Sequence, residues 1–265
     1  MKVVRHGWLT VFMLMAAAAY GIPYEGTPEE IGLAIMKESK ARDEGWGDST
    51  ADMAMILRNK QGDESVRQMV IKSLEVQGDG DKGLTVFNEP RDIEGTAFLS
   101  FSHILEPDEQ WLYLPALKRV KRIASQNKSG PFMGSEFAYE DLSSFEVEKY
   151  TYKYLGEEPC GELMCFKVES YPVDKFSGYS KQVVWLDQDE YRVWKVDYYD
   201  RRESLRKTLE VSDYQLYKDQ YWRPLTQEMT NHTTGKSTVV KMKNIEFDTG
   251  LTDADFNRNA LKRAR

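Results

Sequence analysis

The stretch QWLYLPALKRVKRIASQNKSGPFMGSEFAYEDL, from Gln110 to Leu142, decides the fold of this chain. It joins an apolar and aromatic strand to a basic strand, and then to a loop in which Gly and Pro stand among aromatic residues. Because Gly and Pro mark loops rather than buried elements, the side chains of Phe132, Met133 and Phe137 are expected to be exposed. The segment is therefore expected to cover or contact something apolar.

The same stretch resembles the LolA-like family of outer-membrane lipoprotein-sorting proteins, in which W-L-Y-L-P-x-L-K/R-x-x-R/K-R is followed by F-M-G-S-x-F-x-Y-x-D-L. The resemblance runs from about Ala97 to the C-terminus and includes Tyr154 to Gly156, Val184 to Asp187, Tyr199 with Asp200, and Trp222 to Pro224. It implies an unclosed β-barrel with helices across its mouth and a hydrophobic cavity for acyl chains. By this likeness, the helix that starts at Pro28 and the segment from Pro131 to Leu142 become candidate lids.

The N-terminus has the pattern of a secretory signal peptide. Lys2 and Arg5 form a basic region, residues 8–19 form an apolar region too short to span a bilayer, and Ala17 to Ala19 supply small residues for cleavage. We expect a signal peptide over residues 1–21 and a periplasmic location for the mature chain. A retained membrane anchor is the alternative.

Charge and length limit the classes of protein that remain. The formal net charge of -7 becomes -9 once Lys2 and Arg5 are removed with the signal peptide. An acidic chain is a poor candidate for nucleic-acid binding, which draws on a surplus of Lys and Arg. Wide sheets and barrels commonly reach this length as one unit, so we expect a single domain over residues 22–265.

One strong helix is predicted near the N-terminus of the mature chain. Thr27 followed by Pro28 and Glu30 gives an N-cap, a proline at the first helical position and a capping-box glutamate. Apolar residues then recur at helical spacing, and Gly45 is suited to a left-handed stop. The predicted helix runs from about Pro28 to Glu44.

After Trp46 the apolar residues alternate, which is typical of half-buried strands. Ala97 to Leu105 gives one such run, and turn residues separate the runs at short intervals. We count about a dozen strands joined mainly by hairpins, and such a sheet must curl. The predicted fold is mainly β: a single large antiparallel sheet curled into an unclosed β-barrel, with an N-terminal helix and a loop or helix lid.

The two cysteines, Cys160 and Cys165, lie between strand-like segments, so a hairpin turn is expected near Gly161. In an oxidising periplasm a structural disulfide is the expected state. Redox or metal chemistry is the competing reading. Their spacing is not C-x-x-C and no second pair accompanies them, so the structural reading is favoured.

The predicted cavity or lid residues are apolar and aromatic side chains of the strands and of the loop after Gly130. Methionine is frequent among them, and this flexible side chain suits surfaces that fit varied apolar partners. Ordinary core packing is the alternative reading for all of them. The residues are Met53, Met55, Leu57, Met69, Ile71, Leu99, Phe101, Leu112, Leu114, Phe132, Met133, Phe137, Trp185, Trp194, Trp222 and Met229.

A basic run stands out in this acidic chain: Lys118, Arg119, Lys121 and Arg122. It is a candidate contact for lipid headgroups or for an acidic membrane partner, since complementary charge speeds and orients encounters. Equally, lysine and arginine guard exposed edge strands against aggregation. The sequence favours neither reading.

The expected function is that of a shuttle. No G-x-S-x-G, H-E-x-x-H or Walker-type motif is present, so no catalytic residues, metal or cofactor are expected. We expect a periplasmic carrier that binds a lipid or an acylated protein, with an inner-membrane transporter and an outer-membrane acceptor as candidate partners. The alternative is a periplasmic sensor that uses the same fold to recognise a lipid-like signal or a membrane partner.

Overall fold

The computed structural model describes residues 24–263, so the predicted signal peptide lies outside the described residues. Helix α1 (Pro28–Ala41) begins where the sequence predicts. The Thr27 hydroxyl accepts a hydrogen bond from the backbone N–H of Glu30, and the Glu30 carboxylate accepts one from the backbone N–H of Thr27, at 3.2 and 2.9 Å. This capping box fixes the start of the helix.

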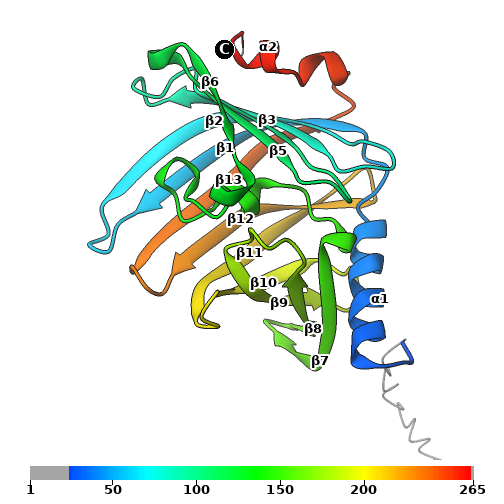
Figure 1. Ribbon diagram of the computed structural model, residues 1–265. Coiled ribbons are helices and arrows are strands. Elements are labelled where there is room, and N and C mark those ends of the chain that lie inside the picture. The colour runs from blue at the N-terminus through cyan, green and yellow to red at the C-terminus, as the bar shows by residue number, and fades with distance from the viewer. Residues whose placement is uncertain (1–23, 264–265) are drawn as a thin grey trace, which may run out of the picture.

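The described residues form one sheet of 13 antiparallel strands (Figure 1). The strands are β1 (Asp48–Arg58), β2 (Glu64–Leu74), β3 (Lys82–Glu89), β4 (Ala97–Phe101), β5 (Glu109–Leu114), β6 (Arg119–Ile123), β7 (Tyr150–Cys160), β8 (Leu163–Pro172), β9 (Tyr179–Asp187), β10 (Val193–Asp200), β11 (Leu205–Tyr217), β12 (Tyr221–Asn231) and β13 (Lys236–Phe247). Short helices are η1 (Pro115–Leu117), η2 (Ser125–Asn127), η3 (Phe132–Gly134), η4 (Tyr139–Leu142), η5 (Val147–Lys149), η6 (Asp253–Asp255) and α2 (Arg258–Leu261).

The strand order is β6-β5-β4-β3-β2-β1-β13-β12-β11-β10-β9-β8-β7, so β6 and β7 are the two edges. Consecutive strands pair as hairpins, except β6 and β7, and β1 joins the two halves by pairing with β13. The edges do not pair with each other, which confirms the predicted unclosed barrel.

The connection from β6 to β7 fills part of the space enclosed by the curved sheet (Figure 1). Phe132 and Phe137 in this connection are 2% and 5% exposed, so the expectation that they would be exposed is wrong. Phe132 lies 5.9 Å from Phe87 and 5.1 Å from Phe98, ring centre to ring centre, over strands β3 and β4. Gly and Pro correctly mark a loop here, but the sheet curls around that loop.

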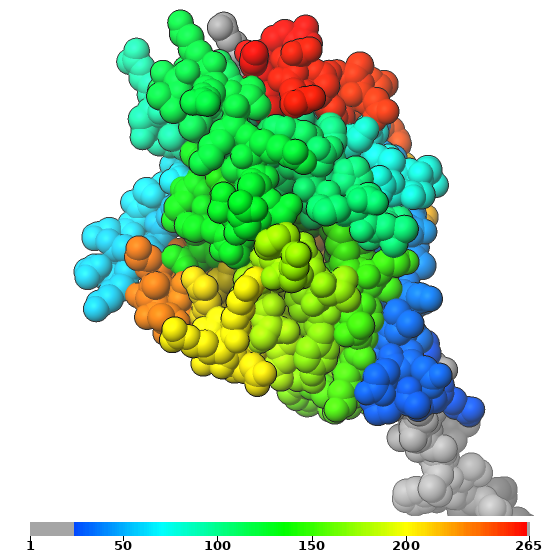
Figure 2. Space-filling model, in the orientation of Figure 1, coloured from blue at the N-terminus to red at the C-terminus, as the bar shows by residue number. Residues whose placement is uncertain are grey.

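The two faces of the sheet carry separate apolar clusters. The inner face holds the main core, with Met55, Phe98, Val168 and Met229 among its members. Towards the β6 edge, a second cluster on the opposite face is covered by the C-terminal segment. In Figure 2 this segment, in red, lies at the top of the molecule, and the β6–β7 connection, in green, occupies the middle of the face.

Two predicted boundaries are corrected. Helix α1 ends at Ala41 instead of Glu44, since Arg42 to Glu44 form turns closed by backbone hydrogen bonds. Strand β4 ends at Phe101 instead of Leu105, because Asp79 accepts hydrogen bonds from His103 Nδ1 and the Ile104 N–H and turns the chain. In the part of the chain that the structure describes, no helix has the length and apolarity needed to cross a membrane.

Candidate functional site

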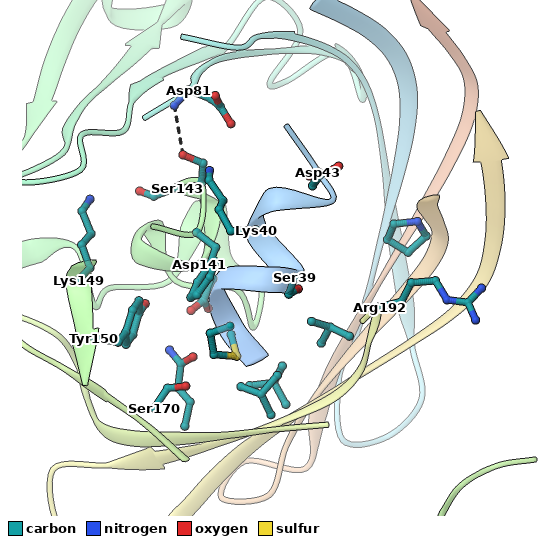
Figure 3. Close-up of a pocket in the computed structure, with 18 of the residues that line it drawn as sticks. Ser39, Lys40, Asp43, Asp81, Asp141, Ser143, Lys149, Tyr150, Ser170 and Arg192 are labelled. Carbon is teal, nitrogen blue, oxygen red and sulfur yellow. Dashed lines mark hydrogen bonds between the residues drawn. The ribbon is translucent and has the colours of Figure 1, made fainter. Parts of the chain in front are cut away.

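A cavity of about 860 Å³ lies between α1, the inner face of strands β8 to β12 and the β6–β7 connection (Figure 3). In Figure 3, Ser39 and Lys40 of α1 lie across the cavity from Ser170 and Tyr150 of the sheet. The apolar part of the lining includes Met36, Trp46, Phe145, Pro172, Val184, Val193, Val196, Tyr214, Trp222 and Pro224.

The C-terminal half of α1 forms one wall. The Ser39 hydroxyl donates to the carbonyl of Tyr191 at 3.0 Å, and Lys40 Nζ lies 3.3 Å from the buried Glu146 carboxylate. At the opposite end of the helix, Gly32 lies against β7. A Cβ there would come within 2.9 Å of the Tyr154 backbone nitrogen, so the helix approaches the strand at backbone contact.

The cavity wall is strongly charged, with six basic and eight acidic side chains. Lys128 Nζ lies 2.6 Å from Asp174, and Lys149 pairs with Asp108. Among the described residues, every basic side chain of the lining forms an ion pair: Lys40, Arg42, Lys128, Lys149, Arg192 and Arg223. The positive charge that faces the cavity is therefore already compensated.

The lining also contains acidic side chains beyond those that pair with its basic residues. Glu140 accepts hydrogen bonds from the Ser177 hydroxyl and the Gly178 N–H at 2.8 and 2.9 Å, and burial raises its pKa. Burial likewise raises the pKa of Asp81 to about 6. Asp141 is compensated by Lys207 Nζ at 3.0 Å, whereas Glu140 and Asp81 form no ion pair with any described residue. The site would therefore resist a further negative charge.

Two rows of side chains cross the inner face of the sheet, one polar and one apolar. Strand register aligns Tyr152, Ser170, Gln182, Tyr198, Lys207 and Asn231 on strands β7 to β12. The neighbouring row, two residues along each of strands β8 to β12, holds Val168, Val184, Val196, Leu209 and Met229. Residues two apart on a strand share a face, so the two rows form one amphipathic surface.

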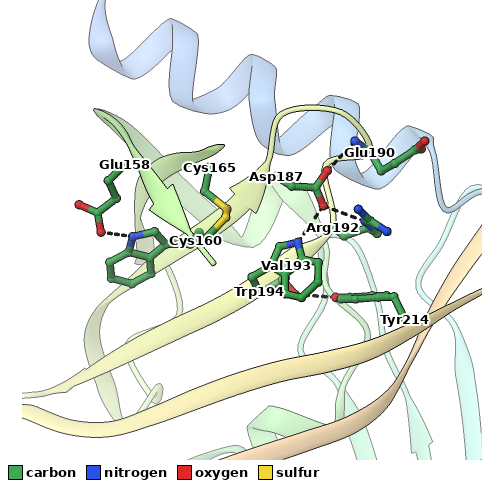
Figure 4. The surroundings of a disulfide bond; sticks show 10 residues. Glu158, Cys160, Cys165, Asp187, Glu190, Arg192, Val193, Trp194 and Tyr214 are labelled. Carbon is green, nitrogen blue, oxygen red and sulfur yellow. Dashed lines mark hydrogen bonds and ion pairs between the residues drawn. A yellow bond between two sulfur atoms is a disulfide. The ribbon is translucent and has the colours of Figure 1, made fainter. Parts of the chain in front are cut away.

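The disulfide between Cys160 and Cys165 closes the β7–β8 hairpin, with Cα atoms 5.8 Å apart, as predicted (Figure 4). Nearby, the fully buried Asp187 carboxylate accepts hydrogen bonds from Arg192 Nε at 2.8 Å and Trp194 Nε1 at 2.9 Å. Arg192 also lies over the Trp222 ring, 4.4 Å from its centre. This network holds one rim of the cavity in place.

Of the side chains that the sequence predicted for the cavity, Trp222 is the one found in its lining. Ile71 is half-buried on β2. The others of the inner face belong to the main core or pack against it: Met53, Met55, Leu57, Met69, Leu112, Leu114, Phe132, Met133, Phe137 and Met229. Whether any of these contacts a ligand stays a prediction.

Four predicted cavity residues lie elsewhere. Leu99 and Phe101 belong to the cluster under the C-terminal segment, and Trp185 and Trp194 belong to the cluster beside the disulfide. For Leu99, Phe101 and Trp185 the reason is strand parity, because successive side chains point to opposite faces. Trp194 lies instead at a shift in strand register between Val193 and Lys195, which interrupts the alternation. For these four, the predicted position in the cavity is wrong.

The basic run lies at the sheet edge but does not form one face. Lys118 caps η1, and the others belong to the edge strand β6. Val120 packs against the cluster under the C-terminal segment, whereas Ile123 belongs to the main core. Alternation therefore separates Arg119 and Lys121 from Arg122.

Sequence reasoning missed the polar members of the lining. Ser170, Gln182 and Tyr198 come from three strands, and each looks like an ordinary polar residue in a strand. The only signal was that Ser170 shares the parity of Phe166 and Val168. Register, which the sequence did not provide, brings the three together.

The fold agrees with comparisons to known proteins. A family model with the description Uncharacterized protein matches residues 79–263. A crystal structure from Vibrio parahaemolyticus, named as an outer membrane lipoprotein-sorting protein domain, is 61% identical and superposes with a TM-score of 0.87, covering 89% of this chain and 100% of that one. The chain belongs to the family of this outer-membrane lipoprotein-sorting domain.

Other LolA-like relatives share the architecture. A DUF1329 family protein from Desulfovibrio piger is 30% identical with a TM-score of 0.84, covering 89% of this chain and 100% of its own. A LolA superfamily protein from Nitrosomonas europaea is 16% identical with a TM-score of 0.69, covering 86% and 98%, and shows the fold alone. Among curated proteins, none matches the chain.

Proposed function

We propose that this protein is a periplasmic carrier that binds a lipid or a lipid-modified protein in its cavity and passes it between membranes, or to and from a membrane transporter. It acts by binding and release, without catalysis. The observation that carries the proposal is the cavity of about 860 Å³ inside the open sheet of a lipoprotein-sorting fold.

The physical requirement for such a carrier is shelter for apolar chains. An acyl chain in water costs about 0.8 kcal/mol per methylene, so a lipid crosses an aqueous space only when its chain is covered. The apolar row at Val184 and Val196, with Met36 and Phe145 opposite, supplies such cover. Release requires that a movable wall open, and α1 and the β6–β7 connection are the walls that belong to no strand.

Mass spectrometry of protein purified gently from its native periplasm tests the proposal. The intact mass under non-denaturing conditions is compared with an organic extract of the same sample, and transfer of labelled lipid between donor and acceptor vesicles is followed. A bound acylated species and accelerated transfer are expected.

A substitution that fills the cavity, compared with the same substitution outside it, tests whether the cavity binds the lipid. Val196→Phe should reduce bound lipid, whereas Val66→Phe, at a half-exposed position on β2, should not. A protein that is empty and fails to take up added lipids would contradict a carrier and favour the alternative, a sensor that binds a membrane partner.

A further inference from the structure

The polar row on the inner face is satisfied at its ends, whereas Ser170 in its middle has no hydrogen-bond partner. At one end the Tyr152 hydroxyl donates to the carbonyl of Val147 at 2.9 Å. At the other end Lys207 Nζ donates to the carbonyl of Glu136 at 3.0 Å, and Asn231 donates to the Glu136 carboxylate at 2.6 Å. These end groups already have hydrogen-bond partners within the fold.

The middle members, Ser170, Gln182 and Tyr198, all line the cavity. Ser170 is 1% exposed, and its hydroxyl has no hydrogen-bond partner. A buried polar group without a partner costs about 1 to 3 kcal/mol, so a partner that arrives with a ligand would recover that energy. The row therefore has an unused binding capacity where it meets the cavity.

The charges around the row select the kind of partner. The basic side chains of the lining are all engaged with carboxylates, as described above, and Glu140 and Asp141 lie near enough to Tyr198 to add to the rise of its pKa that burial causes. A phosphate or carboxylate would meet negative charge and no free cation. Hydroxyl groups both donate and accept, and so match serine, glutamine and tyrosine side chains.

We infer that Ser170, Gln182 and Tyr198 seat an uncharged, hydroxyl-bearing headgroup of an amphiphile whose apolar part lies along Val184 and Val196. The inference rests on the proposed function and names the class of cargo. The apolar row is two residues away on the same strands, so head and tail positions are set by one stretch of sheet.

Three probes carry the same 18-carbon chain length on different headgroups: monooleoylglycerol has uncharged hydroxyls, oleic acid a carboxylate and oleylamine an ammonium group. Cholesterol is a fourth probe, in which the hydroxyl is attached to a ring system. Binding is measured below the aggregation concentration of each probe by native mass spectrometry and by quenching of Trp46 and Trp222, which line the cavity. Monooleoylglycerol or cholesterol should bind at least about tenfold more tightly than oleic acid or oleylamine. Whichever of monooleoylglycerol and cholesterol binds more tightly shows whether the hydroxyl belongs to a glyceride or to a ring alcohol.

Single-group variants locate the contact. Ser170→Ala and Tyr198→Phe should weaken the hydroxyl-bearing probe by about three- to tenfold and leave oleic acid unchanged, since each removes one hydrogen bond. Ser73→Ala, which removes a lining hydroxyl on β2 outside the row, is the control. Ser170→Ala removes an unpartnered buried hydroxyl, so its stability should not fall and weaker binding cannot be attributed to unfolding.

The outcomes are distinguishable. Equal or tighter binding of oleic acid or oleylamine, or a Ser170→Ala effect no larger than that of Ser73→Ala, would overturn the headgroup assignment while leaving the carrier intact. Failure of every probe to bind would overturn the carrier itself.

Discussion

Phe132 shows how a loop residue becomes a core residue. Its ring contacts those of Phe87, Phe98 and Tyr139, with centres 5.1 to 5.9 Å away, and its side chain is buried. Local sequence gives the loop correctly, because Gly130, Pro131 and Gly134 mark it. It does not say that the sheet folds around the loop, because that depends on residues far away in the chain.

Phe132→Ala should therefore destabilise the protein, by about 3 to 5 kcal/mol, since a large buried side chain leaves a void. Urea denaturation measures the loss, and Leu117→Ala, at a position 67% exposed, is the control. An unchanged free energy of unfolding with weaker lipid uptake would instead support a displaceable lid.

Asp81 should make stability depend on pH. Burial is the first cause that raises its pKa to about 6; Glu146 and Glu75 add to the rise and Lys40 opposes it. The folded state then holds the proton more tightly than the unfolded state, so stability decreases as pH rises from about 4 to about 6. Asp81→Asn should remove about 2 to 3 kcal/mol of this decrease.

Urea denaturation of both proteins at several pH values across that range is the measurement. Asparagine keeps the shape of the side chain and carries no charge, so the variant should be the more stable protein at pH 7. A pH profile identical to that of the native chain would disprove the role of this carboxyl.

At the scale of elements, the start of α1 was predictable and its place was not. Thr27, Pro28 and Glu30 act through neighbours within one turn, so the sequence contains the whole cause. Gly32 is different. Glycine is needed at position 32 because the helix contacts the backbone of β7 there, and no pattern within the helix reveals that contact.

Gly32→Ala tests the helix–strand contact. Alanine favours an isolated helix by about 1 kcal/mol, but here its methyl would press on the Tyr154 and Lys153 backbone. A net loss of about 1 to 2 kcal/mol in the free energy of unfolding is expected. Lys37→Ala, on the exposed face of α1, should be close to neutral. Stabilisation by Gly32→Ala would mean that the helix moves freely on the sheet.

Strand existence was predictable from alternation, whereas the cavity lining was not. Alternation places Phe166, Val168 and Ser170 on one face, but it does not say which face is inner. That choice needs the neighbouring strands, and it explains why Leu99 and Trp185 were assigned to the cavity although they lie on the other face. To predict the polar row, the register of six strands would have been needed.

At the scale of the whole molecule, β6 carries positive charge along one edge of an acidic protein. If these side chains contact anionic headgroups, reversing Arg119 and Lys121 to Glu should weaken binding to anionic vesicles about tenfold or more, since each basic residue contributes about 1 kcal/mol near such a surface. Vesicle co-sedimentation at low and physiological salt measures it.

Reversal of Lys236 and Lys241 on β13 is the matched control, since it makes the same change in net charge. If the basic run only guards the edge, the glutamates should guard it equally well. Vesicle binding and solubility would then both match those of the control.

The strand order has a consequence for how such a protein can diversify. Edge strand β6 is separated from β8, β9 and β10 by at least eight intervening strands of the sheet, and the basic run shares no residue with the polar row. If the basic run docks the protein and the polar row holds its cargo, substitutions that alter the docking surface need not alter cargo binding. Relatives could thus exchange destinations while keeping one cargo, or exchange cargoes while keeping one destination, with few compensating changes between the two.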